Sequence, residues 1–116
     1  MTDSFQRVRI ISVNASASSM TINSGASAIL VDASPVGNQR RGFQGYLLYS
    51  KSSAIIDILI DGISTYPGYM NANSSFATSL LLTSEIQYVE AGHTLQMKIT
   101  NDGASSTVFK GTIRYL

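Results

Sequence analysis

The most constraining feature of this sequence is a strict alternation of apolar and polar residues in two segments near its end. In residues 94–100 the apolar side chains of Leu95, Met97 and Ile99 alternate with polar ones, and residues 109–115 repeat the pattern around Gly111. Successive side chains of a β-strand point to opposite faces, whereas a helix would scatter these residues around its axis. Both segments are therefore predicted to be strands with one buried face and one solvent-facing side.

Other runs of apolar and β-branched residues predict further strands. They cover residues 8–13, 19–22, 28–31, 43–50, 56–61 and 79–83. Residues 43–50 are the most uniformly apolar of these runs, which predicts a central strand covered on both faces. Turn residues separate the runs, and the clearest turn signals are Asp61-Gly62, Asn101-Asp102-Gly103, Pro67-Gly68 and Ala91-Gly92.

No stretch has a convincing 3.6-residue period, so no long helix is expected. About seven to nine short strands with regularly spaced turns predict an all-β fold, an antiparallel β-sandwich of the jelly-roll type. The chain has 116 residues, and we assign residues 1–116 to a single domain. Residues 1–7 and 32–41 are expected to be the least ordered parts, and residues 1–7 are expected to form a flexible arm.

The surface is expected to be polar but almost uncharged. Charged residues make up only 13% of the sequence, against roughly a quarter in ordinary soluble domains, and the formal net charge is +1. This charge excludes nucleic-acid binding through a strongly basic surface. It also leaves little electrostatic repulsion between copies of the chain, and we therefore expect a homo-oligomer, with a trimer favoured.

The sequence contains no cysteine, which excludes disulfides, thiolate metal sites and cysteine nucleophiles. Its first residues are polar and show no apolar signal-peptide segment, and no apolar run approaches the ~18 residues of a membrane-spanning helix. We therefore expect a protein that is made in a cytosol, is not exported by a standard route and has no membrane partner.

Residues suited to catalysis are scarce. The single histidine, His93, precedes a predicted strand, and the sequence has no nucleophile elbow, phosphate-binding loop or dinucleotide fingerprint. The seven carboxylates are scattered singly, so no metal site is predicted. A solvated turn histidine is the plainer interpretation, and we expect neither an enzyme nor a cofactor. An enzyme would instead require His93 to lie beside a carboxylate in a pocket.

Half of the basic residues lie within the first 41 positions, namely Arg7, Arg9, Arg40 and Arg41. Arginine binds carboxylates with bidentate geometry, so these residues are candidate contacts with a partner protein. Residues 2–9 would then be a contact arm that becomes fixed only in the assembly. The alternative is that the four arginines serve solubility alone.

A Pro-Gly turn with two tyrosines, Tyr66-Pro-Gly-Tyr69-Met70, is the second candidate site. Tyrosine rings are costly to expose, and loops commonly hold binding residues. Tyr66, Tyr69 and Met70 are therefore candidate contacts with a partner or a neighbouring subunit. Alternatively, Tyr66 and Tyr69 stack on a sugar ring beside Asn71 and Asn73, or the two tyrosines simply cover the open end of the sandwich.

The closing part of the chain, residues 90–104 followed by the strand 108–115, looks like the last hairpin of jelly rolls in small virion proteins of tailed bacteriophages. The strand 56–61 followed by Gly-Ile-Ser-Thr-Tyr66 is similar to the same class, and the resemblance covers about half of the chain. Like this chain, such proteins are cysteine-free β-sandwiches rich in Ser, Thr and Asn. Similar hairpins also close some carbohydrate-binding modules.

Within this class the chain resembles capsid decoration (cement) proteins. The resemblance implies a structural protein without enzymatic activity that binds the outside of the shell, often as a trimer, where major capsid subunits meet. It implies the virion as the location and the major capsid protein as the partner. The alternative function is a carbohydrate-binding module, for example at a phage tail.

Overall fold

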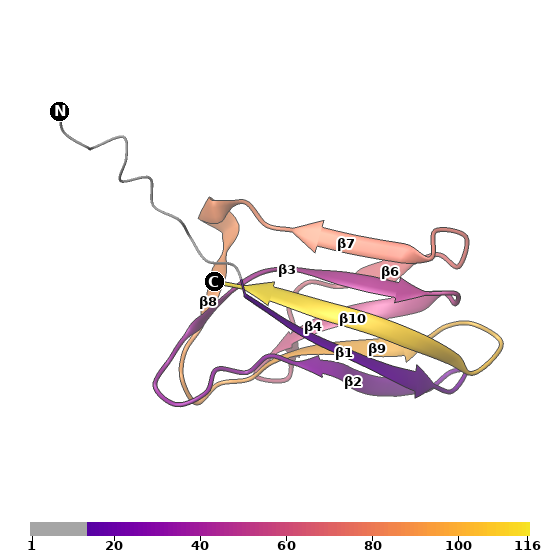
Figure 1. Ribbon diagram of the computed structural model, residues 1–116, viewed down its shortest axis with the longest axis horizontal. Helices are drawn as coiled ribbons and strands as arrows, with labels where there is room; N and C mark the ends of the chain where they lie inside the picture. The colour runs from indigo at the N-terminus through magenta and orange to yellow at the C-terminus, as the bar shows by residue number, and fades with distance from the viewer. Residues whose placement is uncertain (1–13) are drawn as a thin grey trace.

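The computed structural model describes residues 14–116, which form two antiparallel β-sheets packed face to face (Figure 1). Sheet A consists of β1 (Asn14–Ile22), β10 (Thr107–Tyr115), β3 (Arg41–Ser50) and β7 (Phe76–Leu80) in this order, and β8 (Gln87–Val89) also pairs with β3. Sheet B consists of β2 (Ser27–Asp32), β9 (Leu95–Asn101), β4 (Ala54–Ile60) and β5 (Ile63–Ser64), and β6 (Gly68–Met70) also pairs with β4. The prediction of an all-β antiparallel sandwich is confirmed. The predicted strand 8–13 and the arm 1–7 lie outside the described residues.

The described residues contain ten strand segments, one more than the upper end of the predicted range. The difference arises at one edge of β4, which pairs with two short segments, β5 and β6, instead of one strand. Pro67 lies between these segments, and proline has no N–H with which to continue a ladder.

The predicted strand 79–83 is displaced toward the N-terminus. Strand β7 begins at Phe76 and ends at Leu80, because it pairs with β3 from Tyr49 to Gly45. The chain then passes through a short 3₁₀ helix, Thr83–Glu85. Pairing with a neighbouring strand therefore sets these ends more strongly than local composition does.

The core lies between the sheets and contains the apolar faces that the alternation predicts. Gly111 also faces inward, where a β-carbon would lie 2.6 Å from a methyl group of Leu30. This close approach explains why the otherwise apolar face of β10 carries a glycine. The completely buried residues of the three best-predicted strands are Ile56, Ile58, Leu95, Met97, Ile99, Phe109 and Ile113.

Strand β3 is central in sheet A, as predicted, but it is not covered on both faces. Tyr46 and Leu48 point into the core, and burial raises the pKa of the Tyr46 hydroxyl. Tyr49 lies on the outer face and is 50% exposed. The prediction of two covered faces is wrong, because within residues 14–116 no further layer packs on sheet A.

One of the two hairpin signals is confirmed and the other is wrong. Asp61 and Gly62 join β4 to β5 with φ angles of 54° and 78°, the left-handed pair that a type I′ turn requires. Strands β9 and β10, in contrast, do not form a closing hairpin, because β9 belongs to sheet B and β10 to sheet A. Residues 102–106 carry the chain from one sheet to the other.

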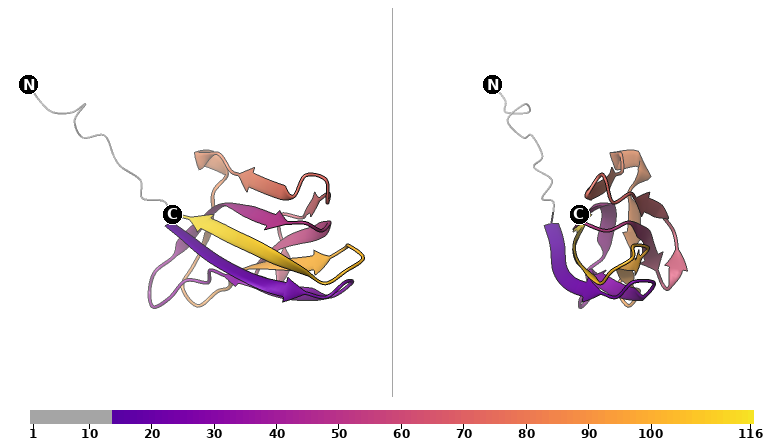
Figure 2. Two further views of the ribbon diagram at one scale, coloured as in Figure 1. Left: turned by 45° about the vertical axis from the view of Figure 1, so that its right-hand side comes forward. Right: turned by 90° about the vertical axis from the view of Figure 1, so that its right-hand side faces the viewer.

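The loops and termini divide between two opposite ends of the sandwich (Figure 1). The Asn14 end carries Asn14, the C-terminus, residues 33–40 and β8, and Asn14 pairs with Tyr115 there. The Asn101 end carries residues 51–53, 71–75 and 102–106, and it faces the viewer in the right-hand panel of Figure 2. Across residues 14–116, no helix is long and apolar enough to cross a membrane.

Candidate functional site

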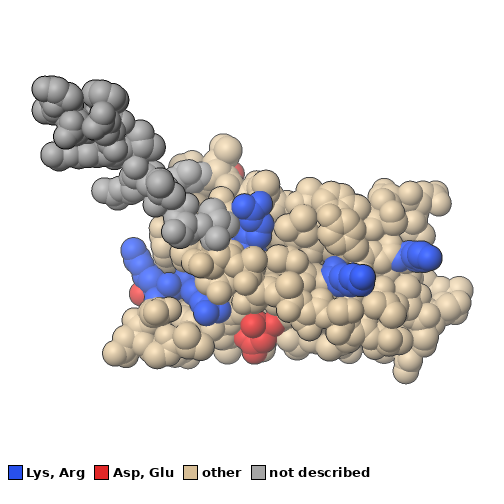
Figure 3. All heavy atoms as spheres, viewed as in Figure 1, with Lys and Arg blue, Asp and Glu red and all other residues tan. Residues whose placement is uncertain are grey.

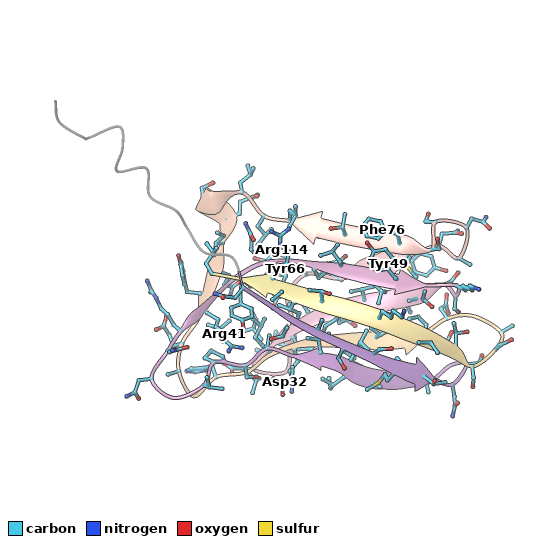
Figure 4. All side chains as sticks on the ribbon, viewed as in Figure 1. Asp32, Arg41, Tyr49, Tyr66, Phe76 and Arg114 are labelled. Carbon is cyan, nitrogen blue, oxygen red and sulfur yellow. The ribbon has the colours of Figure 1, made fainter. Side chains whose placement is uncertain are left out.

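The two adjacent arginines of the predicted basic site have different environments. The Arg41 guanidinium lies 4.2 Å from the centre of the Tyr115 ring, and its Nη1 donates to the Ala33 carbonyl at 2.9 Å. Figure 4 shows this half-buried side chain at the Asn14 end. One Arg41 donor and the face of its guanidinium are thus engaged within the fold, so its geometry favours a structural role over the predicted partner contact.

Arg40 is the exposed member of the pair. Its guanidinium lies 4.2 Å from the centre of the Tyr88 ring and 3.8 Å from the carboxylate of Glu90, and its side chain is 59% exposed. A contact of this length between exposed groups contributes little to stability, so Arg40 is free to exchange Glu90 for a carboxylate on a partner. The other two candidates, Arg7 and Arg9, lie outside the described residues.

Exposed apolar side chains gather at the same end of the molecule. They come from the loop 33–40, the β4–β5 hairpin, the end of β7 with the residues after it, and β8. A sequence cannot show this gathering, because the residues come from four separate segments. The residues and their exposed fractions are Val36 (61%), Ile63 (70%), Leu80 (57%), Leu82 (69%) and Tyr88 (46%).

The structure separates the members of the predicted tyrosine loop. Tyr66 packs against Phe43, with ring centres 5.2 Å apart, and its hydroxyl donates to Gln87 at the Asn14 end. Tyr69 is 56% exposed, and its hydroxyl donates to Asp102 at the Asn101 end. Met70 is only 1% exposed, so its side chain belongs to the core and is not a partner contact.

The predicted sugar-binding platform is therefore not formed, because the Tyr66 and Tyr69 hydroxyls reach toward opposite ends of the sandwich. Asn71 and Asn73 are exposed in the loop after β6. The Asn71 side chain accepts a hydrogen bond from the Asn73 backbone N–H at 2.9 Å, which stabilises the turn. Tyr66 fits the alternative interpretation, in which a tyrosine covers one end of the sandwich.

His93 lies beside a carboxylate, which is the arrangement that an enzyme would require. Its Nδ1 is 2.6 Å from Asp61 Oδ2, and the pair lines a shallow pocket of about 210 Å³ with Tyr88 and Glu90. The other Asp61 oxygen accepts the backbone N–H of Thr94 at 3.0 Å. That hydrogen bond, followed by the one from His93, holds the pKa of Asp61 below its ordinary value.

This pair joins two turns, and its pocket is lined by few other polar side chains. The pocket lining contains no serine, threonine, cysteine or lysine that His93 could activate. Among residues 14–116, no three His, Cys, Asp or Glu side chains are grouped closely enough to hold a metal ion. The geometry thus fits a clasp between the β4–β5 hairpin and the loop before β9.

Comparisons with known proteins do not assign the chain to a family. No family model, no curated protein and no solved structure matches it. The arrangement of the described side chains is therefore the basis for the function proposed next.

Proposed function

We propose that this protein is a non-enzymatic structural protein of a virion, a capsid decoration protein that binds the outside of the shell. The observation that carries the proposal is the gathering of exposed apolar side chains and Arg40 at the Asn14 end, the end from which the chain continues toward Arg7 and Arg9. We call Val36, Arg40, Leu82 and Tyr88 the attachment residues. Exposed apolar side chains at one end of a folded domain are candidates for an interaction site.

The attachment residues have the chemistry of a protein interface. Full burial of a Val or Leu side chain stabilises a complex by roughly 1.5–3 kcal/mol. Tyrosine and arginine are enriched among the residues that dominate binding energy. The stacked Arg40–Tyr88 pair is suited to a carboxylate on the major capsid protein, because the ring holds the guanidinium in place.

We also propose that the sandwich is a jelly roll, as the sequence predicts. Two features support this topology: the chain changes sheet at each step from β1 to β4, and the last two strands insert between earlier ones. Strand β9 lies between β2 and β4, and β10 lies between β1 and β3. Jelly rolls occur in viral capsid domains and also in lectins, so the topology is compatible with both predicted functions but does not choose between them.

Purified native particles provide the test of the proposed function. Mass spectrometry should find the chain in a fixed ratio to the major capsid protein. Protease added to intact particles should remove it, because it lies on the outside of the shell. Absence of the chain from the particles, or resistance to protease until the shell is opened, would contradict the proposal.

A further inference from the structure

An open groove lies on the outer face of sheet A, at the Asn101 end. Its volume is about 640 Å³, within the range of small-molecule sites, roughly 300–1,000 Å³. Strand β3 and the turn after it supply Tyr49 and Lys51, and β10 supplies Val108 and Lys110. The groove is at the opposite end from the attachment residues, so it would face away from a shell bound there.

An aromatic ring forms one wall of this groove. Tyr49 is 50% exposed, and the Phe76 ring packs against it with 4.6 Å between ring centres. Figure 4 shows the two rings side by side on β3 and β7. The strand register places Lys110, Tyr49 and Phe76 in one row across three neighbouring strands. Phe76 therefore supports a ring whose free face is available to a flat apolar ligand surface.

The groove is positively charged and contains no compensating acid. Lys51 and Lys110 line it, and no carboxylate does. Both lysines are exposed, and neither forms an ion pair with any residue of the described chain. Figure 3 shows this face, on which basic side chains stand out from an otherwise almost uncharged surface. A negatively charged group of a ligand is therefore favoured here.

Hydroxyl groups complete the lining. The exposed residues Ser75 and Ser106 line the groove, and the Ser106 hydroxyl donates to the Asn23 side-chain oxygen at 2.7 Å. Each hydroxyl oxygen still has a lone pair with which to accept a hydrogen bond from a ligand. A flat apolar face, a negative charge and several hydroxyl donors occur together within one ring of an acidic sugar, whereas in an acidic peptide they come from separate side chains.

The geometry points to an acidic saccharide as the ligand of this groove. One pyranose ring stacks on Tyr49, its carboxylate pairs with Lys51 and Lys110, and its hydroxyls donate to Ser75 and Ser106. The inference does not rest on the proposed function, because the groove and the attachment residues are at different ends. It places sugar binding on residues other than Tyr66, Tyr69, Asn71 and Asn73.

The test is isothermal titration calorimetry of the full chain with four probes. The probes are a galacturonic acid trisaccharide, sialyllactose, a neutral galactose trisaccharide and a short polyglutamate. At least one acidic sugar should bind at least tenfold more tightly than the neutral sugar and polyglutamate. Tyr49→Ala and Lys110→Gln should each weaken that binding about tenfold or more. The matched variants on sheet B, Tyr69→Ala and Lys98→Gln, should leave it unchanged.

Several results would overturn the inference. They are no binding of either acidic sugar, equal binding of the neutral sugar, or equal binding of polyglutamate, which would indicate an acidic protein partner. Unchanged affinity of Tyr49→Ala, with a circular dichroism spectrum like that of the wild type, would show that binding occurs elsewhere.

Discussion

The Arg41 guanidinium lies over the Tyr115 ring, 4.2 Å from its centre, and joins the loop 33–40 to the last strand of sheet A. Its neighbour Arg40 lies over Tyr88 at the same distance but stays exposed. Two consecutive arginines therefore use the same interaction for different purposes. Arg41 stabilises the fold, and Arg40 is available to a partner.

This difference predicts opposite effects on stability and attachment. Arg41→Ala should lower the free energy of unfolding by about 1–2 kcal/mol, because it removes a partly buried cation–π contact and a hydrogen bond. Arg40→Ala should change it by less than about 0.5 kcal/mol, since its contacts are exposed. Urea unfolding measures both values, and equal losses for the two variants would contradict the assignment.

Among the polar side chains, we expect Asn101 to contribute most to the free energy of unfolding. It is completely buried, and its side chain bonds to Ile22, Ser105, Ser52 and Gly103, which fixes the crossing from β9 to β10. Asn101→Leu should cost about 2–4 kcal/mol, because it leaves several buried groups without partners. Asn38→Leu, in the exposed loop before β3, is the control and should cost little. A small effect of Asn101→Leu in urea unfolding would show that water replaces the side chain.

Two carboxylates predict how the free energy of unfolding changes at acid pH. Hydrogen bonds from Ser34, the side chain first, lower the pKa of Asp32, and those from Thr94 and His93 lower the pKa of Asp61. A lowered pKa in the folded state stabilises the protein above the unfolded-state value near 4, and this contribution disappears as the pH falls through the folded-state pKa.

The free energy of unfolding should therefore decline below about pH 4. In the double variant Asp32→Asn, Asp61→Asn, the decline should be smaller and the curves should converge at low pH. Urea unfolding between about pH 2 and 7 tests this, and parallel curves for the two proteins would refute it.

Self-association is the fourth prediction, and it concerns the free protein. The low net charge and the exposed apolar side chains favour contacts between copies, and a trimer is expected. Sedimentation velocity at tens of micromolar should therefore give a species larger than the 12.4 kDa monomer. A monomer under these conditions would rule out a preformed trimer and leave assembly to the shell.

The sequence predicts which faces are buried more reliably than which strands are neighbours. Alternation identifies the inward-facing residues of β4, β9 and β10, and the Asp61-Gly62 pair identifies the turn between β4 and β5. Alternation has the same form in either sheet, however, and so it cannot show that β9 and β10 lie in different sheets. Asn101, which is buried where the chain crosses from β9 to β10, looks like an ordinary turn residue in the sequence.

The same limit applies to the candidate sites. Tyr69 and Met70 are adjacent in sequence, but pairing of β6 with β4 exposes the first and buries the second. Tyr49 and Lys110 become neighbours only through the register of β3 and β10, strands that are far apart in the chain. Alternation within residues 43–50 does place Tyr49 opposite the core-facing Leu48, and this was the available signal for an outward aromatic ring.

The most direct test of the central claim is the occupancy of the protein on native particles, measured for an attachment variant and a matched control. The attachment variant is Val36→Ser, Arg40→Ala, Leu82→Ser. The control is Ile29→Ser, Ile55→Ser, Lys98→Ala, which removes two exposed apolar groups and a half-buried basic group from sheet B. Particles would be heated stepwise, pelleted and assayed for the bound chain. The account predicts that the attachment variant is lost at least tenfold more readily, whereas the control is retained like the wild type. Equal retention of both variants would show that the Asn14 end does not hold the shell.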